Sequence, residues 1–260
     1  MKQYDTIHLP VSPSCNIQCR FCKRGFSKRG PVSGVSTALL SPTGALTFLD
    51  KALLKNPAIT AVDIAGPGDT LASLHAIETF RLVHEKYPDL INCLSTNGLM
   101  LREKIEILAE VGVRTVTVAV NAVAVPVLAQ ICAYIIHDNQ YLTGEMAARW
   151  LILAQLAGIR KATEAGITVK VNTVLVPGVN GGHISEVAKI TAQAGAKCIN
   201  VMPLIPEYGF SEYRAPTSKE LTNARNLAQR YLPVFEYAVP MSVAGGHNKT
   251  LKSRTVTDAL

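Results

Sequence analysis

Residues 5–22 read DTIHLPVSPSCNIQCRFC, and this stretch decides the fold. Its first part, Asp5 to Pro10, has the pattern of a short strand. The loop after it carries Cys15, Cys19 and Cys22 in the spacing C-x3-C-x2-C. Thiolates this closely spaced can converge on one soft metal centre, and iron–sulfur clusters are the usual occupants of arrays made only of cysteine. The stretch therefore predicts an α/β protein with a metal site in the loop after its first strand.

Two other interpretations of the array stay open. Structural zinc needs a fourth nearby Cys or His to complete its tetrahedron, and the chain has no second C-x2-C or C-x2-H pair. The three cysteines could also be thiols that bind nothing. If the array holds a four-iron cluster, three cysteines leave one iron without a protein ligand, so a small molecule can chelate that iron.

Beyond the array, short β-branched runs alternate with stretches of helical periodicity, which indicates consecutive βαβ units. The predicted strands are Asp5 to Pro10, Ile59 to Ala65, Leu90 to Ser95, Arg114 to Val120, Ile167 to Leu175, Lys197 to Met202 and Val234 to Val239. The clearest predicted helices are Ser73 to Lys86, Leu101 to Val111, Gly144 to Ala165, His183 to Ala194 and Ser218 to Tyr231. Gly112, Gly166 and Gly195 follow three of these helices, where a left-handed residue ends the helix.

The strands of such a chain are parallel, so the function is expected in the loops at their carboxyl ends. No linker or shift in composition divides the chain. We therefore expect a single domain over residues 1–260, with a cluster loop at 11–35 and a basic tail at about 241–260. Periodicity alone does not choose between a barrel and an open sheet.

The composition excludes a disordered chain, because 48% of the residues are hydrophobic and only 17% are charged. Six cysteines in 260 residues are too few for a disulfide scaffold. The N-terminus lacks the apolar run of a secretory signal. The charge-free run between Arg114 and His137 has the pattern of a strand followed by a helix, and not that of a membrane span. We expect a cytoplasmic protein that is not inserted in a membrane.

The array resembles the hallmark of the radical SAM superfamily, which has C-x3-C-x2-C after the first strand and an aromatic residue, here Phe21, before the last cysteine. The resemblance implies a partial (β/α)6 barrel. It also implies that the open iron of a 4Fe–4S cluster binds the amino and carboxylate groups of S-adenosylmethionine. In that family an electron from the cluster splits the sulfonium to give a 5′-deoxyadenosyl radical.

Further segments are similar to the NifB-type maturases, which build the iron–sulfur–carbide core of the nitrogenase cofactor. The matching segments are residues 8–22, 64–72, 93–99, 118–122, 144–161, 169–178 and 199–206. Several of them end a predicted strand, where the mouth of a barrel should be. The resemblance implies a maturase of nitrogen fixation.

Seven residues near the strand ends are predicted to contact S-adenosylmethionine. Glycines allow the backbone to approach a ligand closely, and Asp, Thr and Asn supply polar contacts for an amino acid and a ribose. These residues are Gly66, Gly68, Asp69, Thr96, Asn97, Asn121 and Asn172. The alternative is that the polar ones only cap helices and stabilise turns.

The resemblance also implies ligands for two precursor clusters, and the chain departs from that pattern. The chain begins too close to its first strand for the upstream His of the family, Ser27 stands at the position of a loop cysteine, and the tail has no paired cysteines. Cys93 alone keeps a position that matches a precursor-cluster ligand. We expect Cys93 to bind a substrate cluster, if one is bound.

The remaining cysteines and most histidines are expected to be structural. Cys132 and Cys198 lie in apolar stretches and are predicted to be buried thiols. His75, His84 and His137 show no metal-ligand spacing and are predicted to lie on the surface.

The net charge of +7 is concentrated in two places. The cluster loop carries Arg20, Lys23, Arg24, Lys28 and Arg29, and the tail carries Lys249, Lys252 and Arg254. A solvated basic face explains this pattern, and so does attraction of an anionic partner such as an acidic ferredoxin or flavodoxin that delivers the electron. Proteins that donate clusters or assemble the cofactor are further expected partners. No motif for nucleic-acid recognition accompanies the charge.

The sequence therefore predicts a NifB-like radical SAM enzyme with a 4Fe–4S cluster and S-adenosylmethionine. One alternative is a radical SAM enzyme that acts on an organic or peptide substrate. The other is a non-catalytic carrier or scaffold for iron–sulfur clusters.

Overall fold

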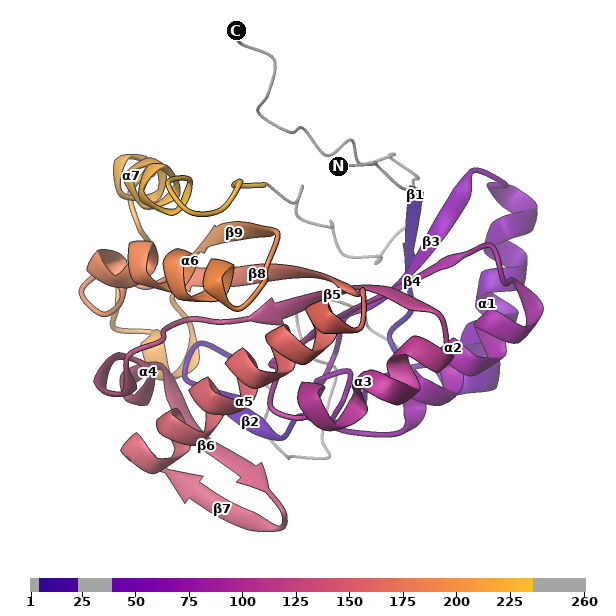
Figure 1. The fold of residues 1–260 in the computed structure, drawn as a ribbon, viewed down its shortest axis with the longest axis horizontal. Coiled ribbons are helices and arrows are strands. Elements are labelled where there is room, and N and C mark those ends of the chain that lie inside the picture. The colour runs from indigo at the N-terminus through magenta and orange to yellow at the C-terminus, as the bar shows by residue number, and fades with distance from the viewer. Residues whose placement is uncertain (1–4, 23–38, 236–260) are drawn as a thin grey trace, which may run out of the picture.

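The computed structural model describes residues 5–22 and 39–235 (Figure 1). Six parallel strands form one curved sheet in the order β1-β3-β4-β5-β8-β9. They are β1 (Asp5–His8), β3 (Ile59–Ile64), β4 (Ile91–Thr96), β5 (Val113–Ala119), β8 (Thr168–Leu175) and β9 (Cys198–Pro203). The predicted partial (β/α)6 barrel is confirmed.

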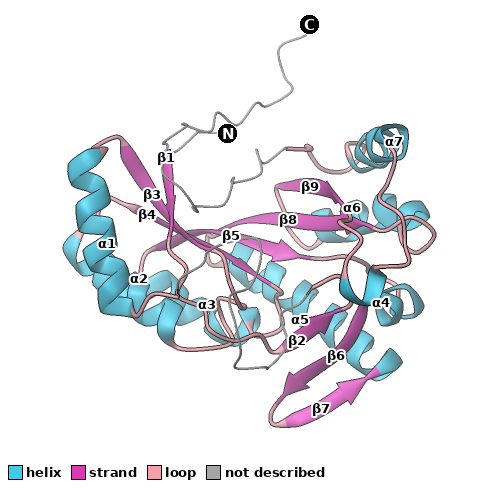
Figure 2. Ribbon diagram, turned by 180° about the vertical axis from the view of Figure 1, so that it is seen from behind, coloured by secondary structure: helices cyan, strands magenta, loops and turns pink. Residues whose placement is uncertain are grey.

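Helices cover one face of this sheet and leave the other face toward the cluster loop (Figures 1 and 2). The helices are α1 (Pro42–Lys55), α2 (His75–Lys86), α3 (Leu101–Glu110), α4 (Val125–Ile131), α5 (Gly144–Glu164), α6 (Ile184–Gln193) and α7 (Ser218–Ala228), with short 3-10 turns η1 (Gly181–His183) and η2 (Tyr208–Phe210). Each crossover between parallel strands carries at least one helix, as parallel pairing requires.

A second, antiparallel sheet of three strands lies at the barrel mouth. It consists of β2 (Ile17–Cys19), β6 (Cys132–His137) and β7 (Gln140–Thr143), in the order β2-β6-β7. Asp138 and Asn139 form the two-residue turn of the β6–β7 hairpin, both with positive φ, as the twist of such hairpins favours. The cluster loop is therefore not an isolated loop, because its strand β2 is paired with this hairpin.

Two hydrophobic clusters form the core. The larger one lies between the six-stranded sheet and its helices, where α3 contributes Leu101, Ile105 and Leu108 from one face. The smaller one contains Ile17 of β2 and Phe210 of η2, together with apolar residues of α4 and the first half of α5. Each buried Leu or Ile of these clusters stabilises the fold by about 1.5–3 kcal/mol. The second cluster ties the cysteine loop to the rest of the molecule.

The predicted helix ends agree with the structure. Gly112, Gly166 and Gly195 all have positive φ after α3, α5 and α6. At Gly195 a β-carbon would also lie 2.7 Å from Thr163 Oγ1, so two constraints favour glycine there.

The predicted strands and helices are all found within two residues of their limits, except at the C-terminal end of α7 and in the last strand. The helix predicted over Ser218 to Tyr231 ends at Ala228. Val234 forms a single bridge with Ile199, and the strand predicted over Val234 to Val239 otherwise lies outside the described residues. The charge-free run before His137 becomes β5, α4 and β6, so the expected strand and helix are followed by a second strand.

Among the helices that the structure describes, none combines the length and the apolar character needed to cross a membrane. The assignment of residues 1–260 to one domain stays a prediction, since the ends of the chain are outside the described ranges.

Candidate functional site

The cysteine array lies on β2 and the turn that follows it. Cys19 pairs with Cys132 across the antiparallel ladder, and the backbone N–H of Arg20 donates to the carbonyl of Ile131 at 2.8 Å. The backbone N–H of Cys22 donates to the carbonyl of Cys19 at 3.0 Å. The Gln18 side chain donates to the carbonyls of both cysteines. These bonds fix the backbone conformation that carries the last two cysteines.

Apolar and aromatic side chains shield the array on one side. Cys15 and Cys19 pack against the smaller hydrophobic cluster, and the Phe21 ring lies 6.4 Å from that of Phe210 between centroids. The backbone N–H of Gly209 donates to the carbonyl of Arg20 at 2.8 Å, which joins η2 to the loop. A partly desolvated surrounding of this kind suits an oxygen-sensitive iron–sulfur cluster.

The donor set fits a four-iron cluster better than a single ion. All three cysteines are half-buried, and none of them forms a disulfide. Within residues 5–22 and 39–235, no three His, Cys, Asp or Glu side chains lie close enough together to hold one metal ion. An iron–sulfur cluster does not require its ligands to meet at one atom, because each thiolate binds a separate iron. Three thiols on one loop are the donor type that such a cluster takes.

The segment after β3 touches the cluster loop through its backbone. The N–H of Gly68 donates to the carbonyl of Ser12 at 2.7 Å, and the N–H of Asp69 donates to the carbonyl of Ser14 at 2.8 Å. A β-carbon on Gly68 would lie 2.0 Å from the Ser14 carbonyl oxygen, which no side chain can tolerate. Gly66 has a φ of 89° at the start of the same segment. Both glycines are thus required by the chain path itself.

The Asp69 carboxylate joins the ends of β3 and β4. It accepts hydrogen bonds from Thr96 Oγ1 at 3.0 and 3.1 Å, from the N–H of Asn97 at 2.5 Å and from the N–H of Leu71 at 2.9 Å. Asp69, Thr96 and Asn97 are all buried. The carboxylate is therefore engaged in organising the strand ends, and direct contact of Asp69 or Thr96 with a cofactor stays a prediction.

Asn97 connects these strand ends to the cysteines. Its Nδ2 donates to Asn16 Oδ1 at 2.7 Å and lies 3.8 Å from the Cys15 sulfur, while its Oδ1 accepts from the N–H of Leu99 at 2.8 Å. An amide that donates to a thiolate sulfur stabilises the charged form that binds iron. Asn97 is placed to orient Cys15.

Two buried amides that were not predicted hold the remaining strand ends. Gln155 on α5 donates to the carbonyls of Asn97 and Ala119 at 2.7 and 2.9 Å. Asn180 donates to the carbonyl of Asn121 at 2.9 Å, and Asn121 Oδ1 accepts from the N–H of Val174 at 2.9 Å. Gln155 could have been recognised from the sequence, because it is a polar residue on the otherwise apolar, buried face of α5.

Asn172 differs from the other predicted polar residues. It is paired with Ala119 of β5 and with Asn200 of β9. Its Oδ1 is buried and accepts no hydrogen bond from any residue that the structure describes. A buried acceptor without a partner costs about 1–3 kcal/mol, so a ligand donor is the natural partner for this atom.

Cys93 lies on β4, next to a hydrogen-bonded pair of a histidine and a carboxylate. Asp63 is its neighbour in the sheet, and His8 Nδ1 lies 3.0 Å from Asp63 Oδ2. Burial, and then the charge of Asp63, raise the pKa of the Cys93 thiol to about 11. Burial lowers the pKa of His8, but the hydrogen bond and charge of Asp63 outweigh it and raise that pKa above 6.5. The sequence does not reveal this pair, because no spacing pattern links residues that lie on different strands.

The structural cysteines are buried as predicted, but two histidines are not surface residues. Burial raises the pKa of both Cys132 and Cys198 to about 11, as in inert thiols. The surface prediction is wrong for His137, whose side chain is only 16% exposed and packs against the Trp150 ring at 5.2 Å. It is also wrong for His84, which is partly buried against Gly112 and has a buried Nδ1.

Several predicted residues cannot be placed. Ser27, Lys23, Arg24, Lys28 and Arg29 of the cluster loop lie outside the described residues. The same holds for the basic tail, including Lys249, Lys252 and Arg254. Arg20 is described and is exposed within the array.

A parallel half-barrel with this cysteine loop after its first strand defines the radical SAM class of proteins. Residues 9–190 match the Radical SAM superfamily. The chain is 42% identical to the FeMo cofactor biosynthesis protein NifB of Methanocaldococcus infernus, over 90% of this chain and 78% of that protein. It is 40% identical to the protein of the same name in Klebsiella pneumoniae, over 89% of this chain and 51% of that longer protein. The chain therefore belongs to the radical SAM superfamily and, within it, to the NifB family.

Solved structures share the fold at low sequence identity. One is the radical S-adenosylmethionine methyltransferase TsrM of Kitasatospora setae, with a TM-score of 0.54 and 15% identity over 76% of this chain and 36% of that one. Another is anSMEcpe with bound AdoMet and a peptide, with a TM-score of 0.57 and 18% identity over 85% of this chain and 58% of that one. Membership of the superfamily makes a 4Fe–4S cluster and S-adenosylmethionine the cofactors of this chain.

Proposed function

We propose that this chain is a radical SAM enzyme of FeMo cofactor biosynthesis and that Cys15, Cys19 and Cys22 hold its 4Fe–4S cluster. One observation carries the assignment of the site. The backbone of Gly68 and Asp69 and the side chain of Asn97 all meet the loop that bears the cysteines. The relatives named for FeMo cofactor biosynthesis support the assignment of the pathway.

The residues near the strand ends that were predicted to contact S-adenosylmethionine would bind and orient it. With both groups bound, the cluster supplies the electron that cleaves the sulfonium. Gly66 and Gly68 let the segment after β3 pass close to the cluster loop, where it would face the methionine part, and Asn172 Oδ1 offers an acceptor for a ribose hydroxyl or an amine. Asp69, Thr96, Asn97 and Asn121 hold the strand ends in place for these contacts.

Cys93 and His8, inside the half-barrel, are the residues that suit a substrate cluster. His8 uses Nδ1 toward Asp63, so its Nε2 is the nitrogen left for iron, an arrangement typical of metal-binding histidines. Binding iron would require the Cys93 thiol to lose the proton that burial holds on it. One His and one Cys are few ligands for a cluster, so we propose transient and not resident binding.

The enzyme needs an electron donor, and we propose an acidic ferredoxin or flavodoxin. Exposed Arg20 lies in the array itself, and the sequence adds basic residues on both sides of it. Cluster donors and cofactor assembly proteins are the further partners that this function requires. A cytoplasmic location is part of the same proposal.

S-adenosylmethionine cleavage tests the proposed activity. We expect the reconstituted protein with dithionite to form 5′-deoxyadenosine and methionine. Asn172→Ala should weaken binding of S-adenosylmethionine about tenfold, because it removes the unpaired buried acceptor, and it should leave the cluster absorbance unchanged. Asn223→Ala, on the exposed face of α7, is the matched control. A loaded and reducible cluster that yields no deoxyadenosine would instead support the carrier function.

Iron content tests the substrate site. We expect about four irons per chain after reconstitution, because Cys93 and His8 are too few ligands to hold a second cluster stably. Cys93→Ala should change this number little, yet lower any activity that depends on a substrate cluster. About eight or more irons, with a second paramagnetic signal that disappears in Cys93→Ala, would contradict transient binding.

A further inference from the structure

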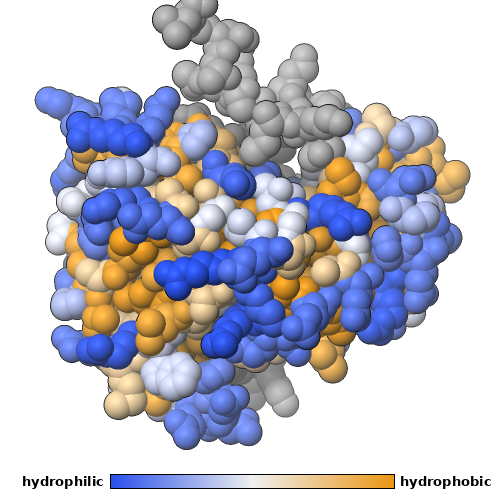
Figure 3. Space-filling model, viewed as in Figure 1, coloured by the Kyte–Doolittle hydropathy of each residue, from blue (hydrophilic) through white to orange (hydrophobic). Residues whose placement is uncertain are grey.

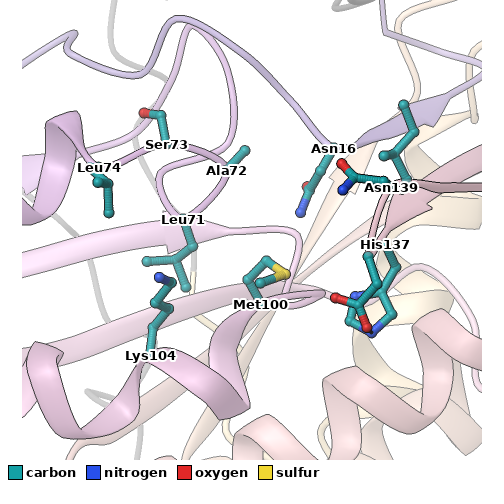
Figure 4. Close-up of a pocket in the computed structure, with 11 residues that line it drawn as sticks. Asn16, Leu71, Ala72, Ser73, Leu74, Met100, Lys104, His137 and Asn139 are labelled. Atoms are coloured by element: carbon teal, nitrogen blue, oxygen red, sulfur yellow. Dashed lines mark ion pairs between the residues drawn. The ribbon is translucent and has the colours of Figure 1, made fainter.

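A cavity outside the barrel mouth belongs to none of the steps above. It has a volume of about 400 Å³ and lies between the segment after β3, the start of α3 and the β6–β7 hairpin (Figure 4). Its lining shares no residue with the predicted S-adenosylmethionine contacts. Its size suits a small molecule.

Two helices begin at this cavity without side-chain caps. The residue before α2 is Leu74 and the residue before α3 is Met100, and both line the cavity. Neither side chain can accept a hydrogen bond from the first turn of its helix. The first turns of both helices therefore present the positive end of the helix dipole to the cavity, although in α3 the N–H of Leu101 already donates to the carbonyl of Gly98 at 3.3 Å. Glu103, in the first turn of α3, is exposed and is not part of the lining.

Side chains add further donors and a positive charge. Lys104 lies on the first turn of α3, with its ammonium group below Leu71 (Figure 4). Asn16 is only 9% exposed, and its Nδ2 makes no hydrogen bond to the residues that the structure describes. Figure 4 shows this amide turned toward the hollow between Met100 and His137. His137 has a buried Nδ1 that also lacks a partner within the described ranges.

The acidic residue of the lining does not cancel this charge. The Asp138 side chain is 83% exposed at the hairpin turn, and its nearest recorded partner is His137 Nε2 at 3.5 Å. A solvated carboxylate at the rim is screened more strongly than Lys104 and the two helix ends. The cavity thus combines many donors with few acceptors.

We propose that this cavity binds a small oxyanion, a phosphate or a dicarboxylate. Lys104, the amide of Asn16 and the first turns of α2 and α3 hold its oxygens, in the manner of phosphate sites at helix starts. Asn16 Oδ1 accepts from Asn97, and Asn97 reaches the Cys15 sulfur at 3.8 Å. An anion in the cavity would therefore contact the cluster loop at Asn16 and be connected through Asn16 and Asn97 to the Cys15 sulfur.

Titration calorimetry on the purified full chain tests the site. The probes are inorganic phosphate and malonate, each at constant ionic strength set with chloride. The probe that binds more tightly identifies the chemical class of the ligand. We expect saturable binding of at least one probe. Lys104→Gln should weaken it about tenfold, as the loss of one charge-assisted contact does. Lys51→Gln, on the exposed side of α1, is the control.

A second pair of variants separates binding from folding. Leu74 is 68% exposed, so both Leu74→Glu and Leu74→Gln should fold normally. Leu74→Glu places a carboxylate beside the start of α2 and should weaken binding of the tighter-binding probe about tenfold, whereas the neutral Leu74→Gln, whose side chain is not a favoured N-cap, should change that affinity less than twofold. Equal affinities for these two variants, or no saturable binding of either probe by the wild-type chain, would overturn the proposal.

Discussion

Replacing Cys15, Cys19 and Cys22 together with alanine is expected to abolish the charge-transfer absorbance of the anaerobically reconstituted protein. Each single replacement should have nearly the same effect, because a three-thiolate cluster that loses one ligand exposes a second iron. Bulk iron should fall from about four per chain to near zero. Absorbance spectra and metal analysis of the same samples provide the measurement.

Cys198→Ala is the control for the loss of a thiol, since Cys198 is buried in β9 and lies outside the array. It should keep full absorbance and cost only the small destabilisation of a minor cavity, about 1 kcal/mol. Absorbance that survives in the triple variant would place the cluster elsewhere. Stoichiometric zinc without iron in the wild-type protein would support the structural-zinc interpretation of the array.

The sequence predicted the half-barrel because its βα units are long and strongly patterned. The alternating side-chain pattern of strands such as Val113–Ala119 can be recognised without tertiary information, and so can the glycines that follow the helices. The sheet β2-β6-β7 could not be predicted in this way. Its strands have three to six residues, and Ile17–Cys19 becomes a strand only because the hairpin pairs with it.

The sequence singled out the polar residues at the strand ends, but it did not indicate how their roles divide. Strand-end chemistry singled out Asp69, Asn97, Asn121 and Asn172 alike. The structure shows that three of them bond to neighbouring strand ends, whereas Asn172 keeps an acceptor without a described partner. That distinction depends on which backbone groups meet at the barrel mouth, so it cannot be predicted from a local sequence pattern. The same reason hid the His8–Asp63 pair.

Gly68→Ala is expected to have the other large effect, through the backbone alone. The new β-carbon would lie 2.0 Å from the Ser14 carbonyl oxygen and 2.5 Å from its carbon, so one of the two segments must move. Overpacking of this kind costs about 1–3 kcal/mol. The hydrogen bonds of Gly68 and Asp69 to Ser12 and Ser14 should break with it. Since a shift of about 1 Å at a positioned site can lower a rate about a hundredfold, deoxyadenosine formation should fall by that factor.

Gly182→Ala is the matched control, because a β-carbon at this exposed glycine meets nothing within 4 Å. Denaturant unfolding, iron content and deoxyadenosine formation should all stay at wild-type values in Gly182→Ala. In Gly68→Ala all three should fall, since the clash lies between the segment after β3 and the loop that carries Cys15. Asn172→Ala, by contrast, should keep its iron and lose only affinity for S-adenosylmethionine. Wild-type stability and activity in Gly68→Ala would mean that the two segments do not touch in the working enzyme.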